Sequence, residues 1–76
     1  MKEVIIYTTP TCGYCKMAKE FFTENNVNYT EYNVGTDLEK RKEMIEKSGQ
    51  MGVPVIFVGG EMTVGFDKPK LSSLLG

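Results

Sequence analysis

Apolar residues change their spacing along the first half of the chain. Residues 3–8 form a short run of β-branched and aromatic side chains closed by Thr9-Pro10, which predicts a buried strand. From Tyr14, apolar residues recur three and four positions apart, which predicts a helix ending near Asn25-Asn26. Its apolar face holds Tyr14, Met17, Ala18, Phe21 and Phe22, although Tyr14 should be exposed because it lies between two cysteines. Residues 28–34 return to alternation with β-formers, so a second strand should follow.

The third quarter of the chain is dominated by charge. Gly35, Thr36 and Asp37 interrupt the pattern before residues 38–47, a segment rich in charged side chains that predicts a second helix. Thr36 is the expected N-cap, with Glu39 three residues later completing a capping box. The charges of this helix predict a solvated face with ion pairs at helical spacing.

Two β-rich runs, residues 55–58 and 61–64, surround Gly59-Gly60. This pattern predicts a hairpin, because a tight two-residue turn of type I′ needs positive φ at both central residues. Asp67 is then the expected N-cap of a short helix over residues 68–75. The inner face of that helix should hold Leu71, Leu74 and Leu75.

The resulting order is βαβ, α, ββ, α within one domain, residues 1–76. A right-handed helical crossover makes the first two strands parallel, and the hairpin adds an antiparallel pair. The sequence therefore predicts an α/β domain with one mixed four-stranded sheet flanked by three helices.

Composition narrows the possible functions. The net charge is −1, with 41% hydrophobic and 25% charged residues, so there is no basic surface typical of nucleic-acid or anionic-membrane binding. The N-terminal apolar run, Val4 to Tyr7, is shorter than the roughly 7 to 15 residues of a signal-peptide core, and no run is long enough to span a membrane. We expect a cytoplasmic protein without nucleic-acid or membrane partners.

Both cysteines lie within four residues, in TCGYCK. Cys12 falls where the first helix should begin, and Cys15 lies one turn further on. Unpaired amides and the positive end of the helix dipole favour an anion at that point, so the Cys12 thiol should ionise more readily than a free thiol. Lys16, one turn after Cys12, should add to this effect.

The absence of histidine excludes Ser/His and Cys/His nucleophilic pairs. A metal site would need two further ligands, and so a dimer that pools the cysteines of two subunits. Inert structural cysteines are the third interpretation. We favour thiol–disulfide chemistry, because Cys-x-x-Cys beside a βαβ pattern in an intracellular chain is typical of a redox site.

Together with Val53-Pro54, Gly59-Gly60 and Gly65-x-Asp67, the Cys12-x-Tyr14-Cys15 motif resembles the glutaredoxins over essentially the whole chain. The resemblance implies the thioredoxin fold and a cis Val53-Pro54 bond. It implies that Cys12 is the nucleophile and Cys15 the resolving thiol.

The same resemblance implies a groove for glutathione as co-substrate, with no tightly bound cofactor or metal. The substrate main chain would lie against Val53 and Pro54, with Tyr14 and Lys16 beside it and Phe66 and Asp67 at the γ-glutamyl end. The expected partners are glutathione, disulfide-containing or glutathionylated proteins and a reductase, and the expected state is a monomer.

Three departures from the family pattern bear on the electron donor. Gly13 replaces the usual proline, and Thr9 and Met51 stand where a lysine and a basic residue are common. Lys16, Arg41 or Lys42 could replace the lost cations.

Two alternatives therefore remain open. Gly65-Phe66-Asp67 resembles small redoxins that are reduced by thioredoxin reductase. Gly13 is also compatible with relatives that share a [2Fe-2S] cluster between two subunits.

Overall fold

The structure, a computed structural model, describes residues 3–75. Seven elements follow the predicted β-α-β-α-β-β-α order. They are β1 (Val4–Thr8), α1 (Gly13–Glu24), β2 (Thr30–Asn33), α2 (Leu38–Ser48), β3 (Val55–Val58), β4 (Glu61–Val64) and α3 (Lys68–Leu75).

The strands form one mixed sheet in the order β2-β1-β3-β4. β1 and β2 are parallel, with α1 as the crossover between them, and β3 runs antiparallel to both β1 and β4. In the central register Ile6 lies between Glu31 of β2 and Ile56 of β3. The predicted fold class, a thioredoxin-type α/β sheet, is confirmed.

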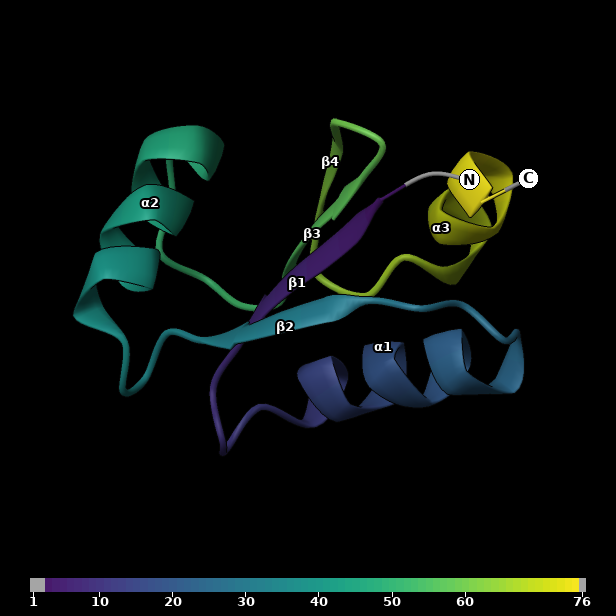
Figure 1. The fold of residues 1–76 in the computed structure, drawn as a ribbon, viewed down its shortest axis with the longest axis horizontal. Helices are drawn as coiled ribbons and strands as arrows, with labels where there is room; N and C mark the ends of the chain where they lie inside the picture. Colours follow the sequence, from purple (N-terminus) through teal and green to yellow (C-terminus); the bar gives the residue numbers. More distant parts are fainter. Residues whose placement is uncertain (1–2, 76) are drawn as a thin grey trace.

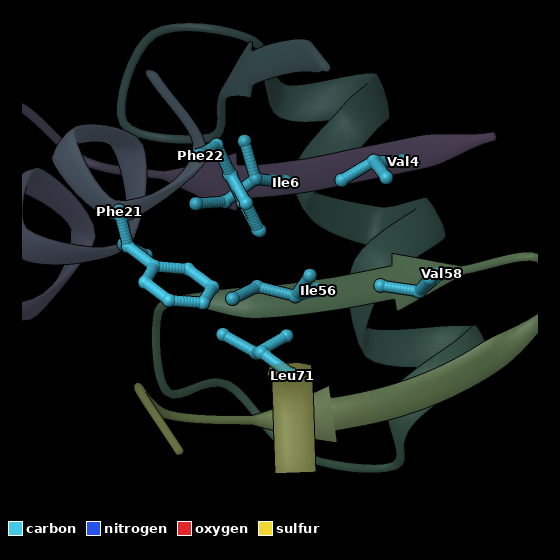
Figure 2. Close-up of a cluster of buried hydrophobic side chains, with 8 residues drawn as sticks. Val4, Ile6, Phe21, Phe22, Ile56, Val58 and Leu71 are labelled. Carbon is cyan, nitrogen blue, oxygen red and sulfur yellow. The ribbon is translucent and has the colours of Figure 1, made fainter. Parts of the chain in front are cut away.

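Alternation along the strands divides the core between the two faces of the sheet. One face is covered by α1 and α3 and the other by α2, as Figure 1 shows. In Figure 2 the side chains of the first face project from the strands towards α1 and α3, with α2 behind the sheet. This cluster holds Val4, Ile6, Ala18, Phe21, Phe22, Ile56, Val58 and Leu71.

The opposite face is smaller and more aromatic. Its buried members are Tyr7, Val34, Met44 and Val55. The Tyr7 ring lies 5.6 Å from that of Tyr32 and 6.0 Å from that of Phe57. The predicted ion pairs at helical spacing form on α2, where the Glu43 carboxylate lies 3.1 Å from the Lys40 ammonium and 3.2 Å from that of Lys47. Both ammonium groups also lie over aromatic rings of the sheet, Lys40 over Tyr32 and Lys47 over Phe57.

The predicted turn and cap in the last third of the chain are confirmed. Gly59 and Gly60 have φ of 56° and 90°, the positive values that the hairpin needs. Asp67 Oδ1 accepts a hydrogen bond from the Lys70 amide at 3.2 Å, as expected of an N-cap. Leu71 is fully buried, and Leu74 and Leu75 pack against the same cluster.

The N-cap predicted for α2 is wrong by one residue. Asp37, not Thr36, caps the helix, and its carboxylate accepts from the Lys40 amide at 3.1 Å. The Thr36 hydroxyl instead faces the Asn33 carbonyl, so the capping box with Glu39 does not form. The predicted second strand, residues 28–34, is also too long, because only Thr30–Asn33 pairs with β1 as strand.

We predict that Leu71→Ala lowers the free energy of unfolding by about 2–5 kcal/mol, because it leaves a cavity between α3 and the sheet. Leu38→Ala is the matched control, since Leu38 is 71% exposed, and its effect should stay within about 0.5 kcal/mol. Urea unfolding of the two variants measures both values. Equal losses would contradict the assignment of α3 to the core.

Candidate active site

The site begins where β1 ends. The chain leaves Thr8 through a tight turn in which the Cys12 amide donates to the Thr9 carbonyl at 3.3 Å. Pro10 follows Thr9 in this turn, where its fixed φ suits the second position. The turn delivers Cys12 to the start of α1.

Cys12 is the N-cap of α1. Its backbone is extended, with φ −89° and ψ 110°, and its sulfur accepts a hydrogen bond from the Cys15 amide at 3.1 Å. The Cys12 carbonyl accepts from the Lys16 amide at 3.3 Å, which closes the first turn of the helix. A sulfur in this place receives both an amide proton and the positive end of the helix dipole, and both favour the thiolate.

The two cysteines differ in exposure. Cys15 is 1% exposed, whereas Cys12 is half-buried and reachable from solvent. Their Cα atoms lie 5.2 Å apart, and the two sulfurs form a disulfide. An accessible sulfur and a sheltered partner one turn deeper suit an exchange in which the first is attacked from outside and the second only from within.

Two other loops reach the same end of the sheet. The Val53–Pro54 peptide bond is cis, as the resemblance implied. Val55 opens β3 opposite Tyr7, so Val53 and Pro54 lie level with the end of β1. The Pro54 carbonyl accepts from the Gly65 amide at 2.8 Å, which ties the segment before α3 to this end as well.

Tyr14 is 64% exposed, as expected for a residue between the cysteines, but Met17 is also 47% exposed. The buried face of α1 instead holds Cys15, Ala18, Phe21 and Phe22. The predicted apolar face is therefore wrong at Met17, and Cys15 takes an inner place that the spacing did not assign to it. Gly13, Tyr14 and Met17 line a surface depression of about 350 Å³ next to Cys12.

The remaining predicted site residues lie on α1 and immediately before α3. The Lys16 side chain is exposed on α1. Phe66 is half-buried and packs edge-on against Phe21, with ring centroids 5.9 Å apart, so it is at least part of the core. Asp67 is exposed and caps α3. A larger hollow, about 410 Å³, is lined by Thr23 and residues 26–29 at the far end of α1, away from the cysteines.

A polar contact that the sequence did not reveal supports the end of β1. The buried Thr8 hydroxyl donates to Glu31 Oε2 at 2.6 Å, and the Lys19 ammonium donates to the same oxygen at 3.0 Å. These hydrogen bonds, that of Thr8 first, hold the pKa of Glu31 below its ordinary value. The contact joins β1, β2 and α1 just before the active-site turn.

Over residues 3–75, no three Cys, Asp or Glu side chains lie close enough together to hold a metal ion. In the same part of the chain, none of the helices has the length and apolar character needed to cross a membrane. A cluster bound at Cys12 and Cys15 would need further ligands from outside this chain.

A parallel βαβ unit with a cysteine pair at the start of its helix, followed by a cis-proline hairpin, defines a dithiol protein of the thioredoxin fold. The comparisons with known proteins narrow this class. The sequence profile of the glutaredoxin family matches residues 4–63, and the chain belongs to that family.

Similar proteins include a glutaredoxin-like protein of the rubredoxin operon of Clostridium pasteurianum, 43% identical over 92% of this chain and 93% of the relative. Glutaredoxin 3 of Escherichia coli is 39% identical over 88% of this chain and 81% of its own. A crystal structure of a thioredoxin-like protein matches with a TM-score of 0.91 at 35% identity, covering 99% and 96% of the two chains. The family and the Cys12–Cys15 pair support a dithiol redoxin with thiol–disulfide oxidoreductase activity.

We predict that Thr8→Val raises the pKa of Glu31 towards its ordinary value of 4.5, because the variant keeps the side-chain shape but removes the donor that lowers this pKa most. The stabilisation from ionised Glu31 is present above pH 4.5 and is lost as pH falls through the lowered pKa. The free energy of unfolding of the variant should therefore fall less steeply in acid than that of the wild type. NMR titration of the Glu31 carboxyl measures the shift.

Lys19→Met is the comparison variant. It removes both the hydrogen bond and the positive charge of Lys19, so it should also raise the pKa of Glu31 towards 4.5. An unchanged pKa of Glu31 in Thr8→Val would contradict the role of the Thr8 hydrogen bond.

Proposed function

We propose that this chain reduces protein disulfides and glutathione mixed disulfides, with Cys12 as nucleophile, Cys15 as resolving thiol and glutathione as the reducing co-substrate. It would do so as a monomer in the cytoplasm, without a tightly bound cofactor. The observation that carries the proposal is the hydrogen bond from the Cys15 amide to Cys12 Sγ at 3.1 Å, at the start of α1. It places a donor on the sulfur that must bear the negative charge.

The chemistry follows from the two exposures. The Cys12 thiolate attacks one sulfur of the substrate disulfide, a new Cys12–substrate disulfide forms, and the other substrate sulfur leaves as a thiolate that takes up a proton. The deprotonated Cys15 then attacks Cys12 Sγ, which releases the second substrate thiolate and leaves the Cys12–Cys15 disulfide. Two electrons have passed from the dithiol to the substrate.

Two molecules of glutathione can complete the cycle. The first attacks Cys12 Sγ, which forms a Cys12–glutathione disulfide and frees Cys15; the second removes that glutathione as glutathione disulfide. Two features support binding of the tripeptide. The exposed Asp67 carboxylate suits the α-ammonium of the γ-glutamyl group, and the main chain of Val53 suits the peptide part.

One observation favours a second candidate, in which thioredoxin reductase supplies the electrons. Met51 is 61% exposed where a basic residue is common, and Tyr14 and Met17 expose further apolar surface beside Cys12. A rim of this kind suits contact with a protein surface better than contact with the carboxylates of glutathione.

We predict that Asp67→Asn separates the two donors. Asparagine caps a helix about as well as aspartate, so α3 should remain intact, but the variant loses the charge that would pair with the glutathione ammonium. The KM for glutathione should rise about tenfold, while turnover with thioredoxin reductase should be unchanged. The measurement is NADPH consumption with glutathione plus glutathione reductase, and separately with thioredoxin reductase.

Cys12→Ser is the control for both assays and should reduce turnover at least about a hundredfold, because the attacking sulfur is gone. If the wild type turns over with thioredoxin reductase alone, thioredoxin reductase and not glutathione is the electron donor. Full activity in Cys12→Ser would overturn the thiol mechanism itself.

A further inference from the structure

A side-chain clip lies immediately before the cis-proline segment. Gln50 Oε1 accepts a hydrogen bond from the Gly52 amide at 2.7 Å, and Gln50 Nε2 donates one to the Gly52 carbonyl at 3.1 Å. One side chain thus holds both main-chain polar groups of a single residue. We call this pair of hydrogen bonds the Gln50 clip.

The Gln50 clip lies in the loop that follows α2, and the start of this loop is also held by hydrogen bonds. Gly49 ends α2 with φ 73°, and its amide donates to the Ile45 carbonyl at 2.8 Å. The Ser48 hydroxyl lies 2.6 Å from the Met44 carbonyl, and the Gln50 amide lies 3.4 Å from the Ser48 oxygen. The main chain is therefore held from the end of α2 as far as Gly52.

Gly52 is the residue that leaves room for the clip. A Cβ at this position would lie 2.7 Å from Gln50 Oε1, closer than a carbon and an oxygen can approach without displacement. The atom in the way is the end of a flexible side chain, so Gly52→Ala should displace the Gln50 carboxamide while the main chain stays in place. The glycine and the glutamine therefore form one unit.

The next residue is the one that the proposed function places against the substrate. Among residues 3–75 the main chain of Val53 makes no hydrogen bond, and the β1–β3 ladder begins only at Val55. The Gly52 amide and carbonyl are occupied by Gln50, whereas those of Val53 have no hydrogen-bond partner among the described residues at this end of the sheet. An extended peptide needs such a pair to dock beside the sheet.

We propose that Gln50 is a positioning residue for peptide-containing disulfides, and that it acts by fixing Gly52 so that Val53 presents its amide and carbonyl to the substrate main chain. The inference rests on the proposed function, and in it Gln50 does not touch the substrate. Without the clip, binding of a peptide would have to order the main chain of Gly52 and Val53, at a cost in conformational entropy. The reaction with a peptide disulfide should therefore be about tenfold slower. A disulfide that lacks peptide groups does not use Val53 and should not respond.

The test uses reduced protein and no external reductant, so that neither candidate donor enters. The rate constant for oxidation of the dithiol is measured with a short peptide carrying an internal disulfide and with hydroxyethyl disulfide. Gln50→Ala and Gly52→Ala should each slow the reaction with the peptide about tenfold and leave the reaction with hydroxyethyl disulfide unchanged. Glu46→Ala, an exposed change on α2, should alter neither rate.

The double variant tests whether the two residues act as one unit. If Gly52→Ala already removes the clip, adding Gln50→Ala should bring no further loss with the peptide. Faster hydrogen exchange of the residue-52 amide in Gln50→Ala would confirm that the amide has lost its acceptor.

Three results would overturn the inference and leave the proposed function standing. They are variants that react with the peptide as the wild type does, equal losses with both disulfides, or additive losses in the double variant. Wild-type protein that reacts with both disulfides no faster than free glutathione would overturn the proposed function, and the role of the clip with it.

Discussion

The hydrogen bond from the Cys15 amide to Cys12 Sγ is the interaction on which the chemistry of this fold depends. Amides in the first turn of a helix have no partner within the helix, and here a sulfur takes the place of the usual capping oxygen. A helix dipole contributes about 0.3–2 kcal/mol, which lowers a thiol pKa by at most about 1.5. Any larger decrease in the pKa requires the directly bonded amide as well. The remaining structure keeps α1 in place so that this amide stays aimed at the sulfur.

The sheet provides that support from two sides. Ala18, Phe21 and Phe22 fix α1 against the first face of the sheet, and Thr8 links the end of β1 to Glu31 and Lys19 just before the turn to Cys12. On the neighbouring strand the Gln50 clip and the bond from Gly65 to Pro54 fix the segment that would hold a substrate. Nucleophile and substrate strand are therefore held by separate sets of contacts at one end of one sheet.

Much of this could be predicted from the sequence, because the strongest signals are local. Gly59-Gly60 permits only a few turn geometries, Asp67 precedes a short apolar helix, and the cysteine pair follows a strand directly. The N-cap of α2 could not be resolved, because Thr36 and Asp37 are neighbouring residues that both suit the N-cap position. Periodicity alone also failed to reveal that Met17 is exposed, since the rotation of a helix against a sheet depends on the partner surface. The Glu31 and Gln50 contacts join side chains to groups that no spacing rule connects.

The central claim is that the protein lowers the pKa of the Cys12 thiol at the start of α1. The most direct measurement is titration of that thiol in reduced Cys15→Ser protein, which keeps the amide of residue 15, by the ultraviolet absorbance of the thiolate. The account predicts a pKa below the value of about 8.5 for a free cysteine. A pKa at or above about 8.5 would contradict it.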